Sequence, residues 1–220
     1  MPISDEVKQQ RAKLKGQGLK AHLSYFWDYY RIHTIVIILV VIGIFSVAKT
    51  MLESKDTIMY AVFLNCTEAP DQEVIFDEFA DYAGIEKDGN TLYIDNSLVM
   101  SSTGDSTTDM YSQQKLVVLL AAAELDVFAA DIETTEKYAA IGNFYDLYTI
   151  LPKEFLAAHQ DEILYAKNDE GQSVATAISL SKSPKTKEWG VYQDVDYYIS
   201  VSAGSTRTAA AVSFIEYLFE

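Results

Sequence analysis

The stretch "MYSQQKLVVLLAAAELDVFAAD", Met110 to Asp131, decides the fold class of this chain. Its centre consists of strong helix formers, which predicts a helix over residues 110–125. The end of the stretch, residues 125–131, is a short apolar run of the kind that forms a buried central strand. A helix that leads directly into a buried strand is the repeating unit of an α/β domain.

The same alternation of helical spacing and strand-like runs continues on both sides of this stretch. Before it, we expect a strand at 57–66, a helix at 69–85 and a strand at 91–100. After it, we expect a helix at 133–142, a helix from Pro152, a hairpin around 168–171, strands at 189–193 and 196–204, and a helix at 205–219 capped by Ser205. This order predicts an α/β fold with a mostly parallel sheet and helices on both faces.

A second apolar stretch, "TIVIILVVIGIFSVA", lies closer to the N-terminus. Residues 32–48 form a run of seventeen residues without Lys, Arg, Asp or Glu, at the short end for crossing a hydrocarbon core of about 30 Å. Aromatic residues within 25–30 and the basic Arg31 and Lys49 extend the run, as is typical of membrane boundaries. We therefore expect a single transmembrane helix over residues 32–52.

Two other interpretations of this run stay open. A core helix of a soluble domain would have one polar side, whereas this run is apolar on every face. A cleaved export signal is compatible with the small residues Ser46-Val47-Ala48, with cleavage after Ala48. The preceding segment of 31 residues is long and rich in aromatic residues, which is more typical of a retained anchor.

The charges around the run predict its orientation. Residues 1–31 contain six Lys or Arg and three acids, and positively charged flanks stay in the cytoplasm. We therefore expect residues 1–31 to be a cytoplasmic, basic, amphipathic segment and residues 53–220 to be an extracellular domain at the cell membrane. Within the first segment, residues 8–31 are expected to contact anionic lipids of the inner leaflet.

The predicted outer part is strongly acidic. Residues 49–220 contain eleven Lys or Arg and twenty-nine acids, a net formal charge of −18. A domain of this charge repels the phosphate backbone, so a nucleic-acid partner is excluded. Cys66 is the single cysteine, which also excludes an intrachain disulfide.

The sequence offers few residues for catalysis. His159 is the only histidine of the predicted outer domain, so a nucleophilic triad would have to use it, and a position on a surface helix is the simpler interpretation. The chain has too few His and Cys for a zinc site and no glycine-rich nucleotide motif. We therefore expect no catalytic residue, no metal and no cofactor. Two weaker patterns are an anion site at Gly204, Ser205 and Arg207 and a calcium site at the Asp194 and Asp196 pair or near Asp105 and Asp109.

Two segments resemble bacterial extracellular solute-binding proteins. "QQKLVVLLAAAELDVFAADIETTEKYAAIGNFYDLYTILPKEF" (113–155) is similar to the middle of their first lobe, through its Asp-Val-Phe strand end, Tyr-Ala helix and Gly-aromatic-Asp-Leu turn. "YYISVSAGSTRTAAAVSFIEYLF" (197–219) is similar to their closing strand and Ala-rich helix. The resemblance implies a domain like one lobe of such a protein. Residues 53–220 are too few for the two lobes that these proteins usually have.

These observations predict a non-catalytic binding or accessory subunit of a membrane protein complex, such as a transporter. Its contact surface is expected to be aromatic, with Trp189 and Tyr192 as candidates.

Two alternatives remain beside that prediction. A tethered solute-binding protein would deliver a small solute to a transporter. Its ligand would lie beyond the carboxyl ends of the parallel strands, at Asn65, Thr67, Asp131 and Thr134. A cell-surface hydrolase with paired carboxylates is disfavoured, because a positioned pair in a substrate cleft usually needs a larger scaffold.

Overall fold

The first unit of the chain contains one long apolar helix. A computed structural model describes residues 19–53, 55–68, 71–101, 106–192 and 196–220, and it divides the chain into two units after residue 54. Helix α2 (Leu19–Glu53) contains a segment, residues 30–50, that is long and apolar enough to cross a membrane. At 1.5 Å per residue, these 21 residues rise about 32 Å, close to a hydrocarbon core of about 30 Å. This helix fits a membrane anchor or an export signal, and the beginning of the expected cytoplasmic segment lies outside the described residues.

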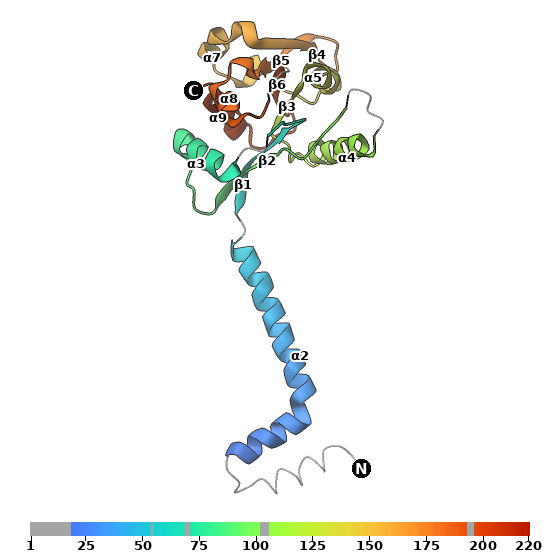
Figure 1. Ribbon diagram of the computed structural model, residues 1–220, viewed down its shortest axis with the longest axis vertical. Helices are drawn as coiled ribbons and strands as arrows, with labels where there is room; N and C mark the ends of the chain where they lie inside the picture. The colour runs from blue at the N-terminus through green and yellow to red at the C-terminus, as the bar shows by residue number, and fades with distance from the viewer. Residues whose placement is uncertain (1–18, 54, 69–70, 102–105, 193–195) are drawn as a thin grey trace. The chain divides into compact units, whose positions relative to one another are not determined.

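The second unit is built on a six-stranded sheet in the order β2-β1-β3-β6-β5-β4 (Figure 1). The strands are β1 (Asp56–Phe63), β2 (Asn90–Asp95), β3 (Val127–Asp131), β4 (Ile163–Lys167), β5 (Ser173–Ser179) and β6 (Tyr197–Val201). β1 pairs in parallel with β2 and β3. β6 is antiparallel to β3 and β5, and β5 is antiparallel to β4.

The sheet is therefore mixed, and the prediction of a mostly parallel sheet is wrong for its second half. β4 and β5 are joined by a tight turn, which requires them to run antiparallel. β6 then enters between β5 and β3 and runs antiparallel to both. Alternation of strands and helices predicts parallel strands only where each helix returns the chain to the same end of the sheet.

Helices complete the second unit. They are α3 (Gln72–Ala83), α4 (Thr107–Ala121), α5 (Ile132–Ala139), α6 (Leu147–Ile150), α7 (Lys153–Ala158), α8 (Pro184–Trp189) and α9 (Thr208–Leu218), with short 3-10 turns at Gln160–Glu162 and Leu180–Lys182.

The prediction of a strand at 189–193 is wrong for the described residues of that range, because Trp189 ends α8. Gly190 follows in the left-handed conformation with φ 65°, which turns the chain away from the helix.

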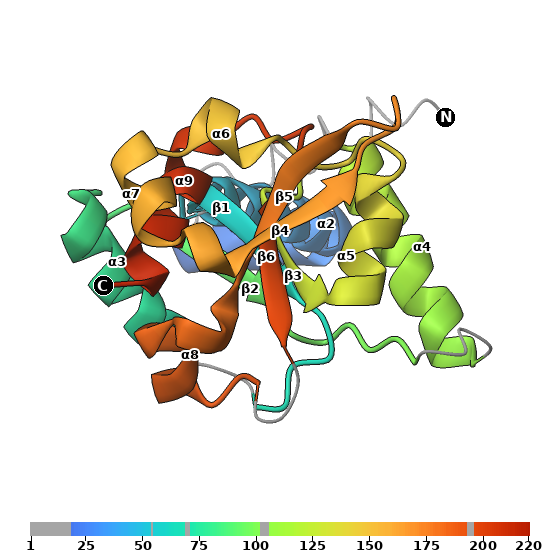
Figure 2. The ribbon, with the colours of Figure 1, turned by 90° about the horizontal axis from the view of Figure 1, so that it is seen from above.

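Both faces of the sheet bury apolar side chains, because successive residues of a strand point to opposite faces. One cluster contains Met59 of β1 together with residues of α3 and α9. The other contains Val62 of β1 and Phe128 of β3, packed with Leu116 of α4 and Tyr138 of α5. Figure 2 shows α3 and α9 on one side of the sheet and α4 and α5 on the other, so helices cover both faces as expected.

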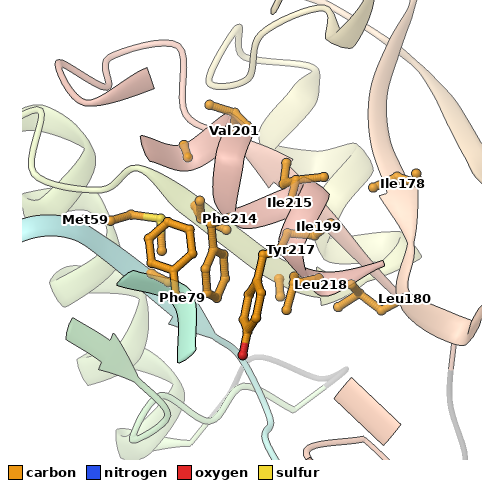
Figure 3. Close-up of a cluster of buried hydrophobic side chains, with 14 of the residues drawn as sticks. Met59, Phe79, Ile178, Leu180, Ile199, Val201, Phe214, Ile215, Tyr217 and Leu218 are labelled. Carbon is orange, nitrogen blue, oxygen red and sulfur yellow. The ribbon is translucent and has the colours of Figure 1, made fainter. Parts of the chain in front are cut away.

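The larger cluster closes around the C-terminal helix α9. Phe214 of α9 meets Phe79 of α3 edge to face, with ring centroids 5.3 Å apart (Figure 3). The ring of Tyr217 packs beside them at 5.7 Å from Phe79, and its hydroxyl donates to Glu78 Oε2 at 2.8 Å. These contacts tie the last helix to the first helix of the domain.

Candidate functional site

The side chain of Asn65, predicted to face a solute, is bonded to the backbone instead. Asn65 follows β1 in the left-handed conformation, with φ 54°. Its amide donates to the Met100 carbonyl at 2.9 Å and accepts from the Met100 N–H at 2.8 Å. Thr67 is exposed, and its backbone N–H donates to the Val191 carbonyl at 2.8 Å. Both residues therefore close turns at the end of β1.

Asp131 and Thr134, the other predicted ligand residues, bond to each other. Asp131 occupies the N-cap of α5 and accepts from the Thr134 N–H at 2.9 Å and from the Thr134 hydroxyl at 3.1 Å. An N-cap of this kind satisfies an otherwise unpaired helix amide. The pair is therefore explained by the start of α5 without a ligand.

Two stacked tyrosines lie near these strand ends. The rings of Tyr192 and Tyr197 are 3.6 Å apart and nearly parallel, and the Tyr192 hydroxyl donates to the Ala129 carbonyl at 3.4 Å. Burial raises the pKa of the Tyr192 phenol well above its usual value. Burial also raises the pKa of the neighbouring Cys66 thiol, whose Sγ donates to the Glu68 carbonyl at 2.6 Å. A thiol held protonated in this way is a poor nucleophile.

Trp189, the second aromatic candidate for an interface, is also half-buried. Its ring centroid lies 6.5 Å from that of Phe214 and 6.3 Å from that of Tyr217. Both Trp189 and Tyr192 pack against the larger apolar cluster. Their side chains thus contribute to the core, and a role for them in an interface stays a prediction.

The predicted anion site at the start of α9 holds a carboxylate of the protein itself. Asp126 is fully buried and accepts from the Ser205 hydroxyl at 2.6 Å, from Arg207 Nε at 2.8 Å and from the Tyr60 N–H at 2.7 Å. Arg207 also donates to the Glu124 carbonyl at 2.7 Å. Arg207 occupies the N-cap of α9, so Ser205 does not cap this helix as expected. The network fixes α9 to β1 and to the start of β3.

The remaining candidates for chemistry have structural roles as well. Asp109, proposed above as a calcium ligand, belongs to the capping box of α4, and hydrogen bonds from Ser101 and Ser106 lower the pKa of its carboxyl far below the usual range. Asp105 and Asp194 lie outside the described residues. The described part of the chain brings no three His, Cys, Asp or Glu together in a group that could hold a metal. The ring of His159 packs against the rings of Phe155 and Phe219, and its centroid lies 4.6 Å from the centroid of each.

Helix α4 carries a surface feature that its fold leaves unexplained. Two of its buried side chains are polar, since Asp109 and Ser112 are each 1% exposed. Its exposed side chains are mostly apolar: Met110 is 56%, Tyr111 60%, Val117 56% and Val118 64% exposed. A normal amphipathic helix exposes polar residues, whereas α4 carries apolar residues on its exposed side as well as on its buried side. Thr107, Thr108 and Ala121 are also exposed, near the two ends of the helix. We name the central exposed residues the α4 outer face; it comprises Met110, Tyr111, Gln114, Val117 and Val118.

The inward side of α4 is polar because it holds the chain segment beneath it. The Asp109 carboxylate accepts from the Ser101 N–H at 2.7 Å, and the Ser112 hydroxyl accepts from the Val99 N–H at 3.1 Å. Among the inward side chains, Leu116 supplies the fully buried apolar contact. Leu119 and Leu120 are partly buried against the smaller apolar cluster, whereas Met110, Tyr111, Val117 and Val118 are exposed.

The α4 outer face is also free of charge. Lys115, the one basic residue of α4, is directed to the buried Asp95, with Nζ 2.5 Å from Oδ2. Burial opposes ionisation of Asp95, but hydrogen bonds from Lys115 and Ser97 lower the pKa of its carboxyl overall. An uncharged apolar surface in a domain with a net formal charge of −19 over residues 53–220 is typical of a region that is covered by another molecule. In Figures 1 and 2, α4 lies at the periphery, on the opposite side of the domain from α3.

The sequence contained a signal for this surface. "KLVVLL", residues 115–120, is apolar around the whole helix rather than on one side. We used this run above only as an indication of helix formation. A helix at the edge of a domain can bury one side, so the apolar residues on its other side must be exposed or covered by a partner.

Comparison of the chain with known protein families, with curated proteins and with solved structures finds no match. The resemblance to solute-binding proteins therefore stays a prediction from the motifs quoted above.

Proposed function

We propose that this protein is a single-pass membrane protein whose extracellular α/β domain is a non-catalytic accessory subunit of a membrane protein complex. The observation that carries the proposal is the α4 outer face. Exposed apolar surface of this kind destabilises an isolated domain in water and is stabilised by contact with another protein.

The first unit supports the membrane part of the proposal. The apolar segment of α2 has the length of a span, and the basic excess of residues 1–31 favours a cytoplasmic N-terminus. Helix α2 continues to Glu53 and β1 begins at Asp56, so the domain follows the apolar segment closely in the chain. A partner of a domain tethered in this way is expected at the membrane.

The contacts at the strand ends favour assembly over the alternative of solute delivery. The polar groups of Asn65 and Asp131 are bonded within the protein. A ligand that used them would have to replace these bonds, and each lost bond costs about 0.5–1.5 kcal/mol. The hydrolase alternative is disfavoured for a similar reason, since the His159 ring packs against two aromatic rings and burial raises the pKa of the Cys66 thiol.

Photocrosslinking in membranes tests the proposal. A photoreactive amino acid is placed at Val118 in the α4 outer face, or at Val74 of α3 as a matched control. Val74 is also an exposed valine on a helix, at 51% exposure, but lies outside the α4 outer face. Irradiation should give a discrete protein adduct from position 118 and none from position 74. Absence of any adduct from position 118 would contradict an accessory role through this surface.

A further inference from the structure

We infer that the α4 outer face binds the same face of a second copy of this chain, as an antiparallel pair of α4 helices related by a two-fold axis at Gln114. This inference rests on the proposed function, in that it takes the α4 outer face to be an interface. It adds the identity of the partner and the register of the contact.

The spacing of the apolar residues is symmetric about Gln114. Met110 and Tyr111 lie four and three residues before it, and Val117 and Val118 lie three and four residues after it. Residues three and four apart lie on one side of a helix. A two-fold axis at Gln114 therefore places Met110 opposite Val118 of the partner and Tyr111 opposite Val117, twice over. Such an isologous contact is the commonest form of association between identical chains.

The polar residue at the centre distinguishes a second copy from other occupants. The Gln114 side chain is exposed and carries both N–H donors and a carbonyl acceptor. At a two-fold axis, two such amides can donate to and accept from each other. A bilayer surface or a wholly apolar partner would leave the amide unpaired, which costs about 1–3 kcal/mol when it is buried.

Charge also argues against the bilayer as the occupant. Helices that lie on membranes usually carry Lys or Arg that attract anionic lipids. The α4 outer face has no such residue, and the domain around it is acidic. Anionic headgroups would repel it.

The small size of the contact predicts how strong the association is. α4 has 15 residues and is about 22 Å long. A pair of such helices buries less than the roughly 800 Å² per partner of a standard stable interface. The pair is therefore weak in solution and depends on the anchor, which confines the copies to one plane and raises their effective concentration. Repulsion between two domains of charge −19 opposes it, so added salt strengthens the association.

The test uses full-length protein in membranes, with Cys66→Ser removing the native thiol. Two copies with different tags carry single cysteines, and mild oxidation forms disulfides only between close positions. Gln114→Cys should crosslink to itself. Met110→Cys in one copy should crosslink to Val118→Cys in the other more than Val118→Cys crosslinks to itself. Val74→Cys should give no dimer.

Two further measurements complete the test. Gln114→Glu, which is close to isosteric at an exposed position, should weaken association at least about tenfold by placing two carboxylates on the axis. Energy transfer between labelled copies should rise when ionic strength increases from about 0.01 to 0.15 M, because the Debye length falls from about 30 to about 8 Å. Dominant crosslinking of position 118 to itself, or no dimer from any position of the face, would overturn the inference. A photoadduct from position 118 that contains only a different protein would overturn the inference and leave the proposed function intact.

Discussion

Asp126→Ala should be among the most destabilising single substitutions in the domain. The Asp126 carboxylate is fully buried and accepts three hydrogen bonds, at 2.6, 2.8 and 2.7 Å. Its removal leaves Arg207, whose side chain is only 22% exposed, without its buried counter-charge. Breaking a buried ion pair by removing one partner costs about 3–5 kcal/mol. That is about a fifth or more of the total stability of a typical domain, about 5–15 kcal/mol.

The assay is urea unfolding of residues 53–220, followed by tryptophan fluorescence. Trp189 is the only tryptophan in this range, and it packs against Phe214 and Tyr217 in the core. Its emission should therefore report loss of the packing around α9.

Glu124 provides a matched control for Asp126. Both carboxylates face Arg207, but the Glu124 side chain is 58% exposed and its Oε2 lies 3.2 Å from Nη2. An exposed pair of this kind contributes about 0–1 kcal/mol, so Glu124→Gln should change the unfolding free energy little. A double-mutant cycle of Asp126→Ala and Arg207→Ala should give a coupling of about 0.5–3 kcal/mol. A loss below about 1 kcal/mol for Asp126→Ala, or no coupling, would refute the reasoning that this network fixes α9 to the sheet.

Three further predictions follow from the fold and the charges. Protease added to intact cells should remove residues 53–220 and spare residues 1–31, whereas a mature N-terminus at Lys49 would show that α2 is a cleaved signal. Folding lowers the pKa of the Asp109 carboxyl, so the ionised carboxylate stabilises the folded protein. This stabilisation is complete above the pKa of about 3.9 that the carboxyl has in the unfolded chain, and it is lost as the pH falls below that value. The urea midpoint should therefore fall between about pH 5 and pH 2, and Asp109→Asn should flatten this dependence and lower the midpoint at neutral pH. Asn65→Ala should destabilise more than Asn65→Gly, because both lose two hydrogen bonds but only alanine is strained at φ 54°.

Local sequence signals predicted several elements well. Asp71 and Gly84, expected as the start and end signals of one helix, occupy the N-cap and the left-handed C-cap of α3. The hairpin expected around residues 168–171 joins β4 to β5. These features depend on the conformational preferences of a few neighbouring residues, which a sequence displays directly.

Strand direction in the second half of the sheet could not be predicted in the same way. It depends on where β6 finds its neighbours, which is a matter of contacts between residues far apart in the chain. The helix α8 was missed although the sequence carries its start signal. Ser183 accepts from the Thr186 N–H, and Pro184 follows in the first turn.

The candidate site illustrates a second limit of sequence reasoning. The rule for strand ends correctly identified polar residues after β1 and β3, but it cannot tell a ligand from an internal hydrogen-bond partner. Asn65 is engaged by Met100 and Asp131 by Thr134, and neither partner is evident from residue type. Replacing Asn65 and Asp131 together should therefore destabilise the domain, because these internal bonds are lost.

The central claim is that the α4 outer face is covered when the protein is in its membrane. The most direct measurement is the rate of thiol labelling of Val118→Cys, in a Cys66→Ser background, with a membrane-impermeant maleimide. The rate is compared between native membranes and isolated residues 53–220, with Val74→Cys as the control. The account predicts labelling at position 118 at least about tenfold slower in membranes and little change at position 74. Equal rates at position 118 in both preparations would contradict it.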